Sequence, residues 1–273
     1  MDNYIKEYNS YDKKILYIFG KGHGGIGDLV KYFAYVLEYC IENKVQIYYL
    51  LTNNALDNYL KLKYPNMYLS KIPDGCININ KWNDDIILEP NKFYCYRPYA
   101  LYDITGKLGG PTELFFNRIR IPINEIFYFN NIVESNAKHY NKSDEEYISI
   151  HVRCGDKFLD TDPKNVLCKH DQRFFDEKTL FNFIRNIKDK RIFFFCDNNK
   201  YKTAIKKEFY DVDLNIIFYE IGHTSLNGTT DEQIINTLTD FYIMAHSKEL
   251  YYFSYSGFPV IAAKYNNIPY YKM

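Results

Sequence analysis

The stretch Tyr147-Ile148-Ser149-Ile150-His151-Val152-Arg153-Cys154-Gly155-Asp156-Lys157 contains the feature that best indicates the fold of this chain. It begins as a short apolar run, typical of a buried strand, and ends in charged residues. In an open α/β sheet, ligands bind beyond the carboxyl ends of the strands. Arg153 offers a planar set of donors that suits phosphate oxygens, and Gly155 permits a sharp turn close to a ligand. The stretch therefore predicts a strand that leads into an anion-binding site; the alternative is a strand that ends in a salt-bridged surface turn.

Strand and helix patterns alternate through the rest of the second half. Strands are expected at residues 191–196, 214–219 and 249–253, and helices at 176–188, 200–209, 231–247 and 257–264. Alternation with short connections predicts a doubly wound parallel sheet.

The first half opens with a strand, a glycine-rich turn and a helix, and then becomes less regular. The expected elements are strands at 14–19 and 46–51, helices at 28–42, 54–63 and 130–140, and helical turns near 113–119. The polar run 141–146 is the expected domain boundary, so the sequence predicts two α/β domains with a cleft between them.

The glycine-rich turn is Gly22-His23-Gly24-Gly25-Ile26-Gly27-Asp28. Glycines allow positive φ and close backbone approach, and the free N–H groups at the start of the next helix favour an anion. The alternative is a tight turn needed only for packing. The segment fits G-x-G-x-x-G, but the second strand ends in Leu50-Leu51-Thr52-Asn53 without an acidic residue, which argues against a nicotinamide-dependent oxidoreductase.

Three further polar residues stand at positions where they could bind a ligand or stabilise the fold. Asp197 follows a strand and is expected to reach a ribose hydroxyl, to hold a neighbouring loop or to cap a helix. Asp240 lies in an apolar helical stretch, where a buried carboxylate needs a partner; the alternatives are a buried ion pair and an exposed position. Ser256 is placed to cap the last helix or to bind phosphate there.

Composition limits the class of partner. With 34 basic and 34 acidic residues the chain has no net charge, so no global field favours nucleic acid or an anionic membrane. No apolar run is long enough to span a bilayer, and residues 1–14 are too polar for a signal peptide. Six scattered cysteines predict free thiols in a reducing compartment, hence a cytoplasmic location. The 29 Tyr and 20 Phe, with many Ile, Asn and Lys, are typical of an AT-rich genome, such as a viral one expressed in a host cytoplasm.

Acidic groups occur at Asp84-Asp85, Asp160-Thr161-Asp162 and Asp211-Val212-Asp213. No cluster of His or Cys accompanies them in the sequence, so no metal site is predicted.

Four segments together resemble the fucosyltransferase superfamily, an α/β superfamily with the GT-B architecture of two facing Rossmann-like domains with parallel sheets. Residues 151–157 resemble its H-x-R-x-[GT]-D motif, with Cys154 where a second Arg is common and a trailing Lys as in the α-1,6 branch. Residues 24–28 are similar to the G-G-x-G-N opening of the α-1,2 branch, with Asp28 in place of Asn. Cys196-Asp197 is similar to the second motif, and residues 240–256 to the third. The order and spacing match over residues 20 to 265.

The resemblance implies an inverting glycosyltransferase without a metal or other cofactor, whose favoured reaction moves fucose from GDP-fucose onto a glycan hydroxyl. It implies an acceptor-side domain at 1–142 and a nucleotide-sugar-binding domain at 143–273. Arg153 would neutralise the β-phosphate, His151 and Asp240 would contact the base, and His23 and Asp28 are the candidate general bases. The implied donor-binding residues are Gly24, Gly25, Gly27, His151, Arg153, Asp156, Asp197, Asp240, Ser254 and Ser256.

Two alternatives stay open at this point. The Gly-x-Gly-Asp turn also resembles that of heptosyltransferases, which share the GT-B fold and use another nucleotide sugar. A protein that binds a nucleotide sugar without catalysis would show the same motifs.

Overall fold

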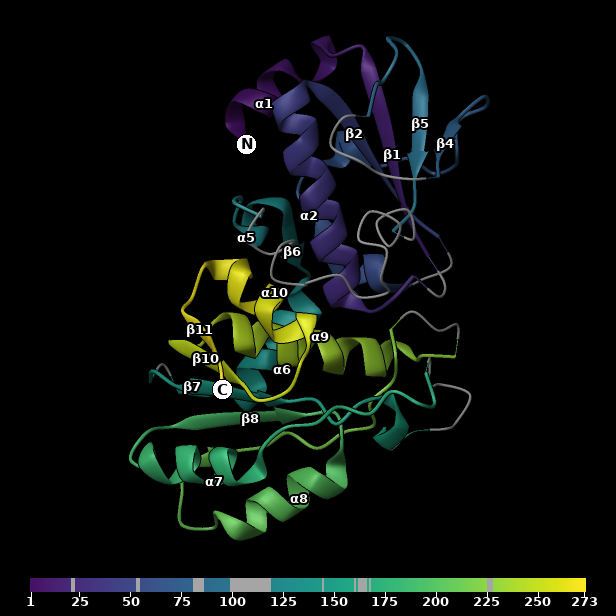
Figure 1. Ribbon diagram of the computed structural model, residues 1–273. Coiled ribbons are helices and arrows are strands. Elements are labelled where there is room, and N and C mark those ends of the chain that lie inside the picture. Colours follow the sequence, from purple (N-terminus) through teal and green to yellow (C-terminus); the bar gives the residue numbers. More distant parts are fainter. Residues whose placement is uncertain are drawn as a thin grey trace.

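The computed structural model describes residues 1–20, 23–52, 55–80, 86–98, 119–143, 145–159, 161, 166, 168–224 and 228–273. In this part the chain forms two α/β lobes, with the N-terminus in the upper lobe (Figure 1). Gly22, the acidic pair 84–85, the flanking acids of 160–162 and nearly all of the expected turns near 113–119 lie outside the described residues.

The upper lobe is built on a parallel sheet of strand order β2-β1-β5-β4. Its strands are β1 (Lys13–Phe19), β2 (Val45–Leu51), β4 (Ile77–Ile79) and β5 (Phe93–Tyr96), and its helices are α1 (Asp2–Glu7) and α2 (Ile26–Asn43). The predicted strand and helix at the start of the chain are confirmed. The described glycines Gly24 and Gly25 directly precede α2, which runs alongside the sheet (Figure 1).

The helix predicted at 54–63 is wrong. The described residues there form a short 3-10 helix (Ala55–Asn58) and strand β3 (Leu60–Leu62), which pairs antiparallel with β6 (Phe127–Phe129). Leu60 and Leu62 are both buried while Lys61 between them is not, which is the alternation of a strand. Pairing with a strand more than sixty residues away in sequence decided this local conformation.

The expectation of six free thiols is also wrong, because Cys76 and Cys95 form a disulfide. Cys76 directly precedes β4, and Cys95 lies on β5, the strand with which β4 pairs. Parallel pairing brings together two cysteines that are 19 positions apart and show no paired spacing in the sequence. Cys40, Cys154, Cys168 and Cys196 are free.

The lower lobe is built on a second parallel sheet, of order β11-β10-β7-β8-β9. Its strands are β7 (Ile148–Val152), β8 (Ile192–Cys196), β9 (Leu214–Asn215), β10 (Glu249–Tyr252) and β11 (Tyr270–Lys272). Only two residues of the strand predicted at 214–219 join the sheet. Counted along the chain, this is the strand order of a dinucleotide-binding half, and it reverses between β7 and β10, where such sheets bind ligands.

Helices cover both faces of the lower sheet. Phe194 and Cys196 of β8 pack with α7 (Glu177–Asn186) and α8 (Asn199–Glu208). Phe193 and Phe195 belong to the core on the other face, with α9 (Asp231–Ala245) and α10 (Gly257–Asn266). Because both faces are covered, β7 and β8 are buried along their whole length, as their near-continuous apolar sequences predict.

Aromatic side chains make up much of the core where the lobes meet. Phe33 of α2 lies edge-on to Phe127, with ring centroids 5.5 Å apart. Phe129 lies 5.0 Å from Tyr265 of α10 and 5.7 Å from Phe241 of α9. These rings belong to one buried cluster that draws residues from both lobes, so the many aromatic residues fix the lobes relative to each other.

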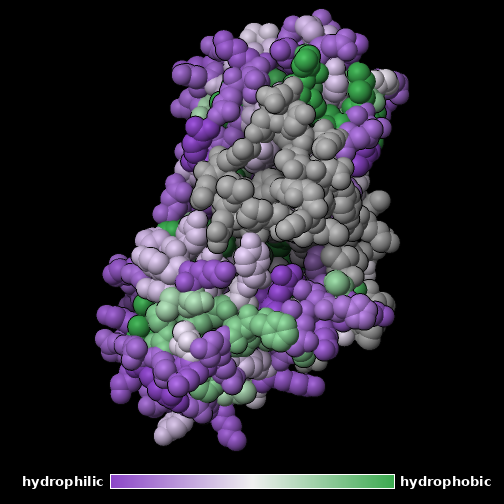
Figure 2. All heavy atoms as spheres, viewed as in Figure 1, coloured by the Kyte–Doolittle hydropathy of each residue, from purple (hydrophilic) through white to green (hydrophobic). Residues whose placement is uncertain are grey.

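Two short helices precede the lower lobe, α5 (Ile123–Ile126) and α6 (Asn131–Tyr140). Helix α6 packs on α9, and α10 packs on both α9 and α2, so elements from either side of the predicted boundary interlock. The division at residues 142 and 143 stays a prediction. In the described part of the chain no helix has the length and apolar character needed to cross a membrane. The face shown in Figure 2 is largely hydrophilic on both lobes, with smaller hydrophobic areas at the upper end and across the lower lobe.

Candidate functional site

A cavity of about 470 Å³ lies between the lobes. Its wall comes from the start of α2, the carboxyl ends of β7 and β8, residues 219–224, the middle of α9 and the start of α10. It therefore occupies the crevice at the reversal of strand order, and its volume is in the range of small-molecule sites. Of the predicted residues, the wall contains Gly25, Gly27, Asp28, His151, Arg153, Asp156, Asp197, Asp240 and Ser256.

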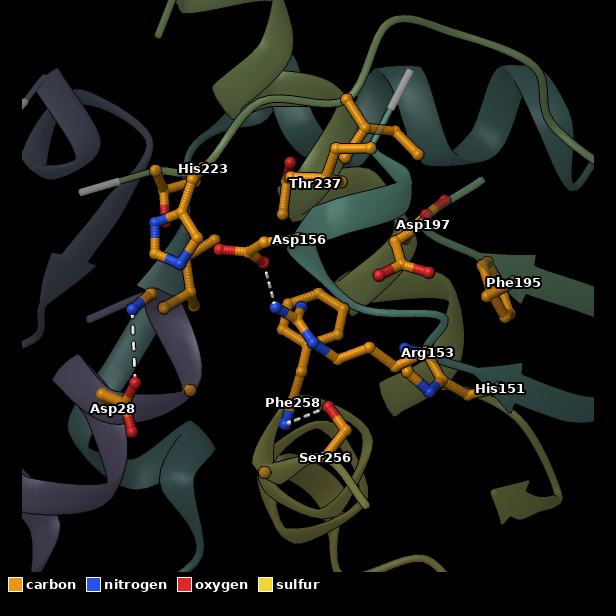
Figure 3. A pocket seen from close by; sticks show the side chains of 18 of the residues that line it. Asp28, His151, Arg153, Asp156, Phe195, Asp197, His223, Thr237, Ser256 and Phe258 are labelled. Carbon is orange, nitrogen blue, oxygen red and sulfur yellow. Dashed lines mark hydrogen bonds and ion pairs between the residues drawn. The ribbon is translucent and has the colours of Figure 1, made fainter. Parts of the chain in front are cut away.

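Arg153 extends into the cavity from the end of β7 (Figure 3). Its Nη2 forms ion pairs with Asp156 and, at 3.3 Å, with Asp171. Burial opposes the charged guanidinium, but the charges of Asp197, Asp156 and Asp171 outweigh it and raise the pKa of Arg153. A permanently charged donor fork thus stands in the cavity wall, and a guanidinium has more N–H groups than these carboxylates engage.

The loop after β7 is held by side chains that sequence analysis had assigned to the donor. The Asp197 carboxylate accepts hydrogen bonds from the backbone N–H groups of Cys154, at 2.6 Å, and Gly155, at 2.9 Å. Ser254 accepts from the N–H of Arg153 at 2.6 Å and is not part of the cavity wall. Asp197 therefore holds a loop, as one alternative predicted, while the cap of α8 is its neighbour Asn198.

Gly155 is required by the shape of this loop. Its φ of +103° lies in the left-handed region, and an added Cβ would stand 2.5 Å from the carbonyl oxygen of Asp171. The loop after β7 thus packs directly against the backbone of residue 171, which brings the Asp171 carboxylate to Arg153.

Several side chains in the wall have buried polar atoms without a hydrogen-bond partner among the described residues, among them His151, Asp240 and the Tyr219 hydroxyl. His151 is 6% exposed and its Nδ1 is unpaired; Asp240 is 9% exposed and its Oδ1 is unpaired. Burial, with the nearby charges of Arg153 and Lys202, lowers the pKa of His151 to about 3. Burial raises the pKa of Asp240 to about 6, although Lys202 and Tyr219 oppose the shift. An unpaired buried polar atom is costly, and a bound ligand would supply the missing partner.

The starts of α2 and α10 both open on the cavity. Asp28 accepts from the N–H of Gly25 at 3.3 Å and pairs with Lys31 at 2.9 Å, so it closes the first turn of α2. Ser256 is the cap of α10 and accepts from the N–H of Phe258 at 3.4 Å. The N-terminus of each helix favours an anion in the space between them.

Gly24 and His23 are not part of the cavity wall. Gly24 has a φ of +108°, and an added Cβ would stand 2.3 Å from the Asp28 carboxylate, so this glycine makes room for the helix cap. The His23 Nδ1 accepts from the N–H of Gly20 at 3.1 Å, and its ring stands edge-on to Phe19. Burial, with Arg97 nearby, lowers the pKa of His23.

Sequence analysis missed His223, which lines the cavity beside Gly25. Asp171 and Arg173 were also missed; they form an ion pair at 2.6 Å, and Asp171 also pairs with Arg153. None of the three belongs to a recognisable motif. The only available signal was position, since residue 223 lies between the last residues of β9 and the start of α9.

One group of three possible metal ligands occurs in the part of the chain that the structure describes. It consists of Cys154, Cys196 and Asp197, and the two Sγ atoms are 3.6 Å apart. The Asp197 carboxylate in this group already accepts two backbone hydrogen bonds. Of the acidic groups noted in the sequence, Asp211 and Asp213 lie within the described residues, and both are exposed.

Comparison with solved structures shows the fold. A mutant of Arabidopsis thaliana FUT1 in complex with GDP is 11% identical, covers 100% of this chain and 74% of its own, and has a TM-score of 0.57. NodZ α-1,6-fucosyltransferase soaked with GDP-fucose is 11% identical over 93% of this chain and 92% of its own, with a TM-score of 0.55. POFUT1 in complex with GDP is 10% identical over 96% and 98%, with a TM-score of 0.52.

No family model and no curated protein sequence matches the chain. At these identities the structural similarity establishes a shared architecture. The chain has the GT-B fold of these fucosyltransferases, and the predicted fold class is confirmed.

Proposed function

We propose that this protein is a glycosyltransferase that uses a GDP-linked sugar, with GDP-fucose as the favoured donor and a glycan hydroxyl as acceptor. The observation that carries the proposal is the unpaired Oδ1 of Asp240, buried in the wall of a cavity that also contains Arg153. Guanine presents two adjacent hydrogen-bond donors on one edge, N1–H and the exocyclic 2-amino group, and a carboxylate can accept from both. The GDP and GDP-fucose complexes of structures with this fold support the same choice.

The diphosphate would lie between Arg153 and the start of α10. Ser256 and the helix N-terminus offer donors there, and the guanidinium offers charge. As the bond from sugar C1 to the phosphate oxygen breaks, negative charge grows on the leaving GDP. Arg153 would offset that charge, which is how the site would accelerate transfer without a metal ion.

The transfer would invert the configuration at C1. The acceptor oxygen would enter from the side of the α2 turn, opposite the leaving phosphate, in the space bounded by Gly25 and Asp28. In this proposal the upper lobe would be the acceptor side and the lower lobe the donor side.

Isothermal titration with GDP, UDP and ADP at about pH 7.5 tests the donor assignment. Adenine lacks both donors and uracil has one, so either base would leave the buried carboxylate incompletely paired, at a cost of about 1–3 kcal/mol. We expect GDP to bind at least about tenfold more tightly than UDP or ADP. Asp240→Ala should erase most of that preference, whereas the matched change at exposed Asp211 should leave it intact. Equal affinities in the unaltered protein would contradict the assignment and favour another nucleotide sugar.

An assay of GDP release from GDP-fucose distinguishes an enzyme from a protein that only binds the nucleotide sugar. Tight GDP binding without any turnover, either to water or to a panel of glycans, would identify a non-catalytic nucleotide-sugar-binding protein.

A further inference from the structure

We propose that His223 is the general base that takes the proton of the attacking hydroxyl. This inference rests on the proposed function and adds to it a residue that no motif of the sequence indicates. His223 stands in the cavity wall on the side of the start of α2 (Figure 3). An added Cβ on Gly25 would lie 3.7 Å from its Cε1 and 3.9 Å from its Nε2. The imidazole edge thus borders the space that the acceptor would enter.

The backbone at residue 223 is fixed on the start of α9. The Thr229 hydroxyl donates to the His223 carbonyl oxygen at 2.5 Å. Gly222 approaches the first turn of α9 so closely that an added Cβ would stand 2.6 Å from the Gln233 amide oxygen. Gln233 in turn accepts from the N–H of Thr230 at 2.9 Å as part of the helix cap. The backbone of His223 is therefore held against the start of α9.

The charges around the imidazole suit a proton acceptor. Burial lowers the pKa of His223, and Arg153 adds to this, while Asp156, Asp28 and Asp171 oppose it. The ring is neutral at physiological pH and can accept a proton. Once protonated, it stands near carboxylates that stabilise the cation.

The other candidate bases are less well placed. Asp28 is engaged by Lys31 and by the cap of α2. His23 lies outside the cavity wall. His151 lies on β7, in the lobe assigned to the donor.

The proposed step is balanced in atoms and charge. The acceptor oxygen forms its bond to C1 while its proton passes to an imidazole nitrogen of His223. The bond from C1 to the phosphate oxygen breaks, and its electron pair leaves with GDP, whose charge Arg153 offsets. Water then removes the proton from the imidazolium.

The test compares His223→Gln and His223→Ala with His139→Gln, a control at an exposed position on α6. The probes are GDP, for binding, and GDP-fucose with water as acceptor, for turnover. We expect GDP affinity to change less than about threefold in all three variants. The kcat for GDP release should fall about 100-fold or more in both His223 variants and stay unchanged in the control. Added imidazole should restore part of the activity of His223→Ala.

The dependence of kcat on pH at saturating donor provides the readout that a structural role would not move. In the unaltered protein, kcat should fall as pH drops through the pKa of His223, because the protonated ring cannot accept a proton. In His223→Gln this fall of kcat at low pH, the acidic limb of the profile, should be absent. Normal kcat in a folded His223→Gln, or a slower variant that keeps the limb, would overturn the proposal. Failure of the unaltered protein to bind GDP would instead refute the function on which it rests.

Discussion

Asp240→Asn should stabilise the free protein while it damages donor recognition. The Asp240 carboxylate is buried, and burial raises its pKa from an ordinary value of 3.8 to about 6. A shift of about two units corresponds to about 3 kcal/mol of penalty for holding the ionised group in the folded state. An amide of the same shape carries no charge and avoids most of this cost.

The penalty must depend on pH in a defined direction. Because the folded-state pKa of Asp240 is raised, the folded protein binds this proton more tightly than the unfolded chain does. Below about pH 4 the group is protonated in both states, so no penalty exists. The penalty grows between about pH 4 and pH 6 and is complete above pH 6. Relative to the unaltered protein, the variant should therefore gain stability as pH rises through this window.

Urea unfolding of both proteins without ligand, at about pH 4.5 and about pH 7.5, measures the effect. We expect the variant to gain roughly 1–3 kcal/mol of unfolding free energy between the two pH values relative to the unaltered protein, with Asp211→Asn as an exposed control that gains nothing. Two results would contradict this reasoning. The first is a stability difference between the two proteins that is the same at both pH values, and the second is an asparagine variant that is less stable than the unaltered protein at about pH 7.5. Either would show that ionised Asp240 carries no such penalty in the folded state.

Three further outcomes follow from the site and the fold. Arg153→Ala should reduce transfer by about 2–4 kcal/mol of transition-state stabilisation, and Arg153→Lys should also impair it because the bidentate fork is lost; normal kcat at saturating GDP-fucose in the alanine variant would contradict the role of Arg153. EDTA should leave activity intact, since cationic side chains and helix N-termini are placed to carry the leaving-group charge; loss on chelation that Mn²⁺ or Mg²⁺ restores would refute this. Thiol titration of the denatured protein should find four free cysteines before reduction and six afterwards, and six before reduction would contradict the pairing of Cys76 with Cys95.

The fold was predictable from sequence where local pattern and tertiary environment agree. β7 and β8 are short apolar runs, and both strands are buried along their whole length, as the sequence pattern of a parallel sheet covered on both faces predicts. Prediction failed at residues 54–63 because β3 exists only through pairing with β6. It failed at Cys76 and Cys95 for the same reason, since the pairing of β4 with β5 is invisible to residue spacing.

The site was predictable to the extent that its residues follow strands or interrupt apolar helices. Arg153 and Asp197 come at or just beyond strand ends, and Asp240 is a carboxylate on an otherwise apolar helical stretch. Sequence alone could not decide whether Asp197 contacts a ligand or a loop, because that depends on the path of residues 154 and 155. It could not find His223, which belongs to no periodic element and enters the cavity only because its segment is bound to the start of α9.

The ion pairs around Arg153 fix its side chain in the free protein and would still leave it available to the proposed phosphate. Asp171 is shared: it pairs with Arg153 at 3.3 Å and with Arg173 at 2.6 Å. Asp156 accepts from the N–H of Cys168 at 3.1 Å in addition to its pair with Arg153. If the proposed diphosphate drew the guanidinium partly away, Asp171 would keep Arg173 and Asp156 would keep the N–H of Cys168, so neither buried carboxylate would be left without a partner. Arg153→Lys removes the planar fork that would hold a carboxylate and a phosphate oxygen at the same time. We therefore expect this substitution to weaken donor binding more than it lowers the free energy of unfolding.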